Sequence, residues 1–191
     1  MKRTLTVSLF LVTLVGGLLN GATITLSGSL SPANENPPVA STATGSATVT
    51  LDTIAHTLMI DLNFSGLTSN TMAAHIHCCV QPPGNTGVAT TVPAFPGFPL
   101  AVTSGTYRGT LNLLDAGSYN PAFITANGGV PNADVLFENG FQNFQTYLNI
   151  HTVSFPGGEV RAFLTPEPGT SVMAAIGGGA LLLIRRLRRR G

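Results

Sequence analysis

Residues 46–51 read SATVTL and residues 57–64 read TLMIDLNF, and in both stretches the side chains alternate between two faces, one of them apolar. Side chains two residues apart on a strand point to the same side, so this period predicts half-buried β-strands. The alternation recurs in residues 107–113, 148–150 and 160–164, with glycine-containing turns between the stretches. Half-buried strands need a second layer. We therefore expect an all-β domain, an antiparallel β-sandwich with Greek-key-like connections.

Two stretches depart from this alternation. Residues 132–144 place five apolar side chains at roughly helical spacing, which predicts one short amphipathic helical insertion with Asn132 as a candidate N-cap. Residues 81–99 are rich in proline, and we expect them to form a long, irregular surface loop.

Basic residues are concentrated at the two ends of the chain. Of nine Lys and Arg residues only Arg108 and Arg161 lie between positions 4 and 184, whereas all eight Asp and Glu residues lie there. Two positive against eight negative charges give this central region a formal charge of −6. An acidic body of this kind argues against nucleic-acid binding.

Residues 1–22 have the three parts of a secretory signal peptide. Lys2 and Arg3 precede an apolar run over residues 5–19, and small residues follow at positions 21 and 22. We expect signal peptidase to cleave there; an uncleaved N-terminal signal helix acting as an anchor is the alternative. The mature domain then spans residues 23–165.

The C-terminal segment, residues 166–191, also has three parts. Pro166, Glu167 and Pro168 precede an apolar stretch at 170–184 and an arginine-rich tail. The stretch is short for a transmembrane helix, which takes about 20 residues, but terminal arginines can snorkel and would remain in the cytoplasm. The segment resembles the PEP-CTERM sorting signal. That resemblance implies an inner-membrane-anchored precursor, processed by an exosortase and delivered to the cell surface or extracellular matrix; a permanent anchor is the alternative.

Four short motifs in the central region carry a second resemblance. They read NENPPV at 34–39, GLT at 66–68 leading into AHIH at 74–77, NIHT at 149–152, and PGGEVR at 156–161. Together they resemble the CHRD domain, first named in chordin, over essentially all of residues 23–165. Asn36 stands where that family usually has an apolar residue, and Ala162 where it usually has glycine. The resemblance implies the β-sandwich fold, and it implies no defined activity for exported microbial proteins.

His75 and His77 are the sharpest candidates for site chemistry. On a strand they share one face, about 6.5–7 Å apart along the chain, and can bind one Cu or Zn ion if a third ligand converges. His151 is the candidate third ligand, because it faces away from Leu148 and Ile150. A structural cluster in which His, Glu and Arg satisfy one another is the alternative. The expected neighbours of these histidines are Glu35, Cys79, Glu159 and Arg161.

Cys78 and Cys79 are adjacent, so their Cα atoms are too close for a relaxed disulfide. A vicinal or an intermolecular bridge remains open in an oxidising compartment. Cys79 is a candidate soft ligand or nucleophile beside His77, with simple space-filling as the alternative. His56, at a strand entry, is expected to be exposed.

Signatures of several enzyme classes are missing. The chain lacks a Gly-x-Ser-x-Gly motif, a phosphate-binding loop and a His-Glu-x-x-His motif, and it contains no Trp for a carbohydrate-binding platform. Residues 66–77 resemble the copper-binding strand of Cu/Zn superoxide dismutases, but no matching downstream His cluster follows.

Two functional hypotheses result. The first is a non-enzymatic binding or structural module at the cell surface, whose partners are extracellular polysaccharide or protein. The second is a copper- or zinc-binding β-sandwich, with redox chemistry as a further option, that uses His75, His77 and His151.

Overall fold

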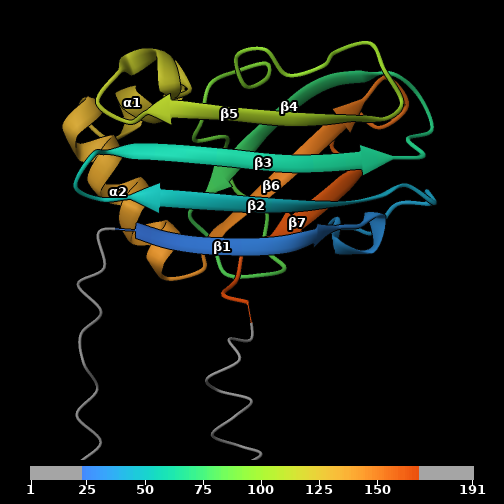
Figure 1. Ribbon diagram of the computed structural model, residues 1–191, viewed down its shortest axis with the longest axis horizontal. Coiled ribbons are helices and arrows are strands. Elements are labelled where there is room, and N and C mark those ends of the chain that lie inside the picture. Colours follow the sequence, from blue (N-terminus) through green and yellow to red (C-terminus); the bar gives the residue numbers. More distant parts are fainter. Residues whose placement is uncertain (1–22, 168–191) are drawn as a thin grey trace, which may run out of the picture.

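The computed structural model describes residues 23–167. Within this range seven strands form two antiparallel sheets that pack face to face (Figure 1). One sheet has the order β1-β2-β3-β5 and the other the order β4-β6-β7. The strands are β1 Thr23–Leu30, β2 Thr44–Asp52, β3 Thr57–Ser65, β4 Thr71–Cys78, β5 Gly105–Asn112, β6 Thr146–Thr152 and β7 Val160–Phe163. The predicted β-sandwich is confirmed.

The alternating apolar side chains of β2 and β3 form the centre of the core. The register pairs Leu51 with Leu58 and Val49 with Ile60, and all four side chains are fully buried. Each sheet turns such an apolar face toward the other, which removes both faces from water and supplies the main stabilising term. The chain crosses between the sheets after β3, after β4 and after β5.

The sheet β4-β6-β7 is covered on both faces, and this arrangement positions the site. Every residue of β6 is buried. Its inner face carries apolar residues such as Leu148 and Ile150, whereas Asn149 and His151 alternate with them on the outer face. Residues 31–43, 79–104 and 153–159 supply loops that contact this outer face. A buried polar layer therefore lies outside the hydrophobic core.

Residues 79–104 contain no strand or helix, as expected, but they are not simply a surface loop. Phe95 and Phe98 are buried and contact the ring of Tyr107 at centroid distances of 5.6 and 5.8 Å. The loop thus contributes aromatic side chains to the core, and its proline content alone does not reveal this role.

Four short helical segments complete the described fold: the 3-10 helices η1 Pro32–Asn34 and η2 Ala116–Ser118, and the α-helices α1 Pro121–Ala126 and α2 Val130–Gln142. The helix predicted over residues 132–144 is observed as α2, shifted by two residues, but the expectation of a single helix and of Asn132 as its cap was wrong. Asn120 caps α1, accepting a hydrogen bond from Ala122 N at 3.0 Å. Helix α2 begins two residues before Asn132, after Gly129 at φ 124°, a conformation that favours glycine.

No helix within residues 23–167 is long and apolar enough to cross a membrane. The predicted signal peptide, Pro168, the apolar stretch at 170–184 and the arginine-rich tail lie outside the described residues.

Candidate metal centre

The structure brings His75, His77 and His151 together on the outer face of the sheet β4-β6-β7. Strands β4 and β6 are neighbours, and their register pairs His75 with Asn149 and Ala73 with His151. The centroid of the His75 ring lies 4.8 Å from that of His77 and 4.6 Å from that of His151. All three residues are buried. One potential ligand atom from each lies within 4.8 Å of the other two.

Each imidazole is oriented by a backbone carbonyl from a covering loop. Nδ1 of His75 contacts Pro93 O at 3.1 Å, Nδ1 of His77 contacts Thr86 O at 2.7 Å, and Nδ1 of His151 contacts Pro156 O at 2.9 Å. A carbonyl oxygen only accepts hydrogen bonds, so Nδ1 carries the proton in every ring. In the neutral ring this leaves Nε2 with a free lone pair.

The three Nε2 atoms are buried and have no hydrogen-bond partner among the described residues. Burial lowers the pKa of His75 to about 4, with His151 adding to the effect. Burial likewise lowers the pKa of His77 to about 3 and depresses the pKa of His151. At neutral pH the rings are therefore uncharged, which is the form that binds metal ions.

This donor set suits copper or zinc. Imidazole is a good ligand for both ions, and three-histidine sites leave a fourth position for water or another ligand. The hydrogen bonds from Nδ1 to carbonyls are the outer-shell contacts that normally fix the tautomer of a ligating histidine. The geometry thus provides three neutral, preoriented ligands.

The expected neighbours Glu35 and Arg161 pair with each other beside the cluster. Glu35 Oε2 lies 3.0 Å from Arg161 Nη2, and both side chains are almost fully buried. The Arg161 guanidinium stacks over the Tyr147 ring at 4.0 Å, and that ring stacks on His77 at a centroid distance of 4.5 Å. Burial raises the pKa of Glu35, although Arg161 opposes this shift. These side chains form one wall of the site rather than its ligands.

Glu159 belongs to a separate network. Its carboxylate accepts hydrogen bonds from Thr152 Oγ1 at 2.6 Å, Ser41 Oγ at 2.7 Å, Thr68 N at 2.7 Å and Thr68 Oγ1 at 2.8 Å. The GLT motif at 66–68 and the PGGEVR motif at 156–161 are thereby joined. These hydrogen bonds hold the covering loops together. Glu159 is not among the grouped ligand atoms.

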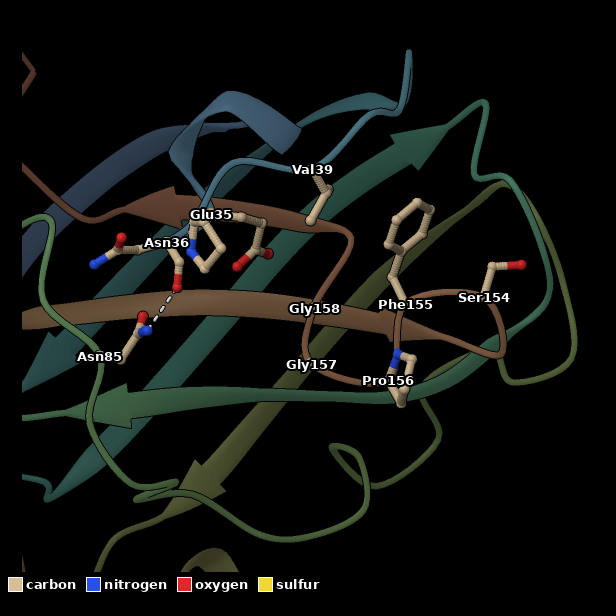
Figure 2. A pocket seen from close by; sticks show the side chains of 10 residues that line it. Glu35, Asn36, Val39, Asn85, Ser154, Phe155, Pro156, Gly157 and Gly158 are labelled. Atoms are coloured by element: carbon tan, nitrogen blue, oxygen red, sulfur yellow. Dashed lines mark hydrogen bonds between the residues drawn. The ribbon is translucent and has the colours of Figure 1, made fainter.

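A surface pocket of about 390 Å³ adjoins this polar layer. Figure 2 shows Glu35 and Asn36 on one side of it and the turn through Pro156, Gly157 and Gly158 on the other. Asn85 Nδ2 donates to Asn36 O at 2.7 Å, which ties two of the covering loops together. Pro156 lines the pocket and also supplies the carbonyl that orients His151.

Cys78 and Cys79 form a vicinal disulfide. Cys79 is therefore not a free thiolate, and it is not part of the histidine cluster. Its sulfur lies close to Gly140 of α2, so its position suits packing and not metal binding. The prediction of Cys79 as a neighbour within the site is not supported by this placement.

A second group of ligand-type side chains was missed by the sequence reasoning. His56 is only partly exposed, and its Nδ1 lies 2.8 Å from Asp134 Oδ2 and 3.3 Å from Glu138 Oε1. Asp134 and Glu138 are spaced i, i+4 on a helix, and that spacing was the only local signal available.

The family model described as the CHRD domain matches residues 26–164. No curated protein matches the chain. No solved structure matches it either.

Proposed function

The chain belongs to the CHRD domain family, and we propose that its domain is a metal-binding module that holds a copper or zinc ion with His75, His77 and His151. One observation carries the proposal: three buried imidazoles converge, each with Nδ1 engaged by a carbonyl and Nε2 free of any partner in the described structure.

The competing interpretation is a structural polar cluster. Such a cluster should satisfy its own buried polar atoms, because an unpaired buried acceptor costs about 1–3 kcal/mol. Here Nδ1 donates outward in every ring, so the three Nε2 atoms are all acceptors and cannot bond one another. A bound cation satisfies all three at once.

The proposal needs no catalytic turnover. We propose a non-enzymatic surface or matrix module whose metal ion stabilises the loops over the sheet or contributes to binding an extracellular polymer or protein. The routing proposed with it (export by a signal peptide, and sorting by an exosortase from a membrane-anchored precursor) is supported by the sequence of the two ends.

The decisive experiment measures metal content and affinity in the purified full chain. After incubation with excess Zn²⁺ or Cu²⁺ and dialysis, the triple variant H75A/H77A/H151A should retain about one equivalent less than the unaltered chain. The Cu²⁺-loaded chain should show nitrogen ligands by electron paramagnetic resonance. Circular dichroism of both metal-free proteins provides the folding control.

Thr146→Val is a matched control, because it alters a buried polar residue of β6 outside the histidine triad. It should leave the metal content unchanged. Equal metal uptake by the unaltered chain and a folded triple variant would remove the proposal.

A further inference from the structure

The chain has four histidines, and His56 is the one outside the three-histidine cluster. It lies in the turn between β2 and β3, with φ of 49°, and its carbonyl accepts a hydrogen bond from Leu113 N at 2.7 Å. Helix α2 lies at the same end of the sandwich (Figure 1). The turn thereby presents the imidazole to the middle of that helix.

Two carboxylates of α2 meet the imidazole. Asp134 and Glu138 are one helical turn apart and share a face. The Asp134 side chain is 5 % exposed and Glu138 is 15 % exposed. Tyr119 Oη donates to Asp134 Oδ1 at 3.3 Å and holds that carboxylate, while Oδ2 faces Nδ1 of His56 at 2.8 Å.

The contacts inside this group are close, and both lie within ion-pair distance. His56 Nδ1 and Glu138 Oε1 are both buried, and neither has a hydrogen bond of acceptable geometry in the described structure. In a tetrahedral zinc site, ligand atoms about 2.0–2.2 Å from the ion lie roughly 3.4 Å apart. The observed separations of 2.8 and 3.3 Å from Nδ1 are near that value, so small side-chain movements would accommodate an ion.

The charge of the group also favours a divalent cation. Residues 23–167 contain no lysine and two arginines, and these pair elsewhere, Arg108 with Asp61 and Arg161 with Glu35. Burial raises the pKa of Glu138 and the neighbouring Asp134 raises it further, whereas His56 opposes this shift. Two ionised carboxylates carry a charge of −2, which a divalent ion neutralises fully and a single positive charge only by half.

We propose that His56, Asp134 and Glu138 form a second metal site, suited to Zn²⁺ and separate from the three-histidine centre. One nitrogen and two oxygen ligands are a donor set that zinc accepts, with water in the remaining position. The site joins the β2–β3 turn to α2, so its ion cross-links the sandwich to its helical end.

The test counts Zn²⁺ bound to the purified full chain by mass spectrometry after dialysis. The isosteric variants E138Q and D134N should each bind about one equivalent less than the unaltered chain, and D134N retains an oxygen acceptor for Tyr119. H56N is a third variant, because asparagine tolerates positive φ and cannot supply the imidazole. Asp61→Asn is the control: it removes an exposed carboxylate paired with Arg108 and should leave the zinc count unchanged.

The outcomes separate this site from the three-histidine centre. H75A/H77A/H151A should still bind one equivalent, and adding E138Q to it should abolish binding. If E138Q, D134N and H56N all bind as much zinc as the unaltered chain, the group is an ion pair with protonated His56 and this inference fails. In that case H75A/H77A/H151A can still bind one zinc equivalent less than the unaltered chain. The proposed three-histidine centre would then hold although the second site fails.

Discussion

Replacing Arg161 with methionine should expose how strongly the polar layer depends on one buried ion pair. The Arg161 and Glu35 side chains are 3 % and 4 % exposed, and the pair separation is 3.0 Å. The change removes the partner charge and the hydrogen bond to Asn85 at 2.8 Å, and leaves the Glu35 carboxylate buried. Removing one partner of a buried pair typically costs about 3–5 kcal/mol. We expect R161M to lose this amount of unfolding free energy at pH 8.

The penalty should depend on pH, and its sign follows from Glu35. Burial already raises the pKa of this carboxyl, and loss of Arg161 removes the main opposing effect. A carboxyl with a raised folded-state pKa favours folding below its unfolded pKa, and that contribution is lost as pH rises through the folded pKa. Each pKa unit corresponds to about 1.4 kcal/mol. The penalty of R161M should therefore be smaller at pH 5 than at pH 8.

Urea denaturation of both proteins at the two pH values measures these differences. The variant E35Q/R161M is the control, because it contains neither charge; it should be more stable than R161M at pH 8 and lack the additional pH dependence. A loss below about 1 kcal/mol for R161M, or a penalty equal at both pH values, would refute the reasoning.

Three further predictions concern packing and ionisation. Gly140→Ala places a methyl group against both sulfur atoms of the vicinal disulfide and should cost about 1–3 kcal/mol in urea denaturation, whereas Gly87→Ala, with open space around it, should stay within about 0.5 kcal/mol. Burial alone would raise the pKa of Glu159, but the hydrogen bonds to its carboxylate outweigh burial and lower this pKa. The ionised carboxylate therefore stabilises the fold at neutral pH, and this contribution is lost as pH falls through the folded-state pKa. Glu159→Gln should cost about 2–4 kcal/mol at pH 7, and this difference from the unaltered chain should shrink in acid; an unchanged difference would contradict the assignment. Because the pKa values of His75 and His77 are lowered to about 4 and 3, the metal-free protein should lose stability as pH falls from about 6.5 toward 4, by up to about 1.4 kcal/mol per pH unit for each ring, and a flat melting temperature over that range would argue against buried neutral imidazoles.

The strands were predictable from sequence because the periodicity is local. Residues 46–51 and 57–64 alternate without interruption, and both stretches lie within observed strands. The ends of the helix were harder to predict from sequence, since Gly129 and Pro131 set the start of α2 two residues before the predicted start at Asn132. Burial of Phe95 depends on the space between two sheets, which no local pattern encodes.

The site was predictable in part for the same reason. His75 and His77 share a face by strand periodicity, and the side on which His151 projects follows from its own strand. The pairing of β4 with β6, which brings these histidines together, joins segments far apart in the sequence and appears only in the structure. Glu159 was expected beside the histidines, but its hydrogen bonds lead to Thr68 and Thr152 instead. His56 reaches α2 across more than seventy residues of sequence, so its role was invisible to local reasoning.

The partners of the buried polar side chains on the outer face of the sheet β4-β6-β7 support the proposed metal centre. Glu159 is fully buried, and the fold surrounds it with four donors from three segments. Glu35 and Arg161 neutralise each other in the same layer, although Glu35 Oε1 and Arg161 Nε have no hydrogen-bond partner in the described structure. The fold also orients every imidazole of the cluster through Nδ1, yet gives none of the three Nε2 atoms a donor among the described residues. Each histidine offers one potential ligand atom within 4.8 Å of the other two. Three acceptors cannot stabilise one another, whereas one cation can pair with all three, so this arrangement suits a metal ion.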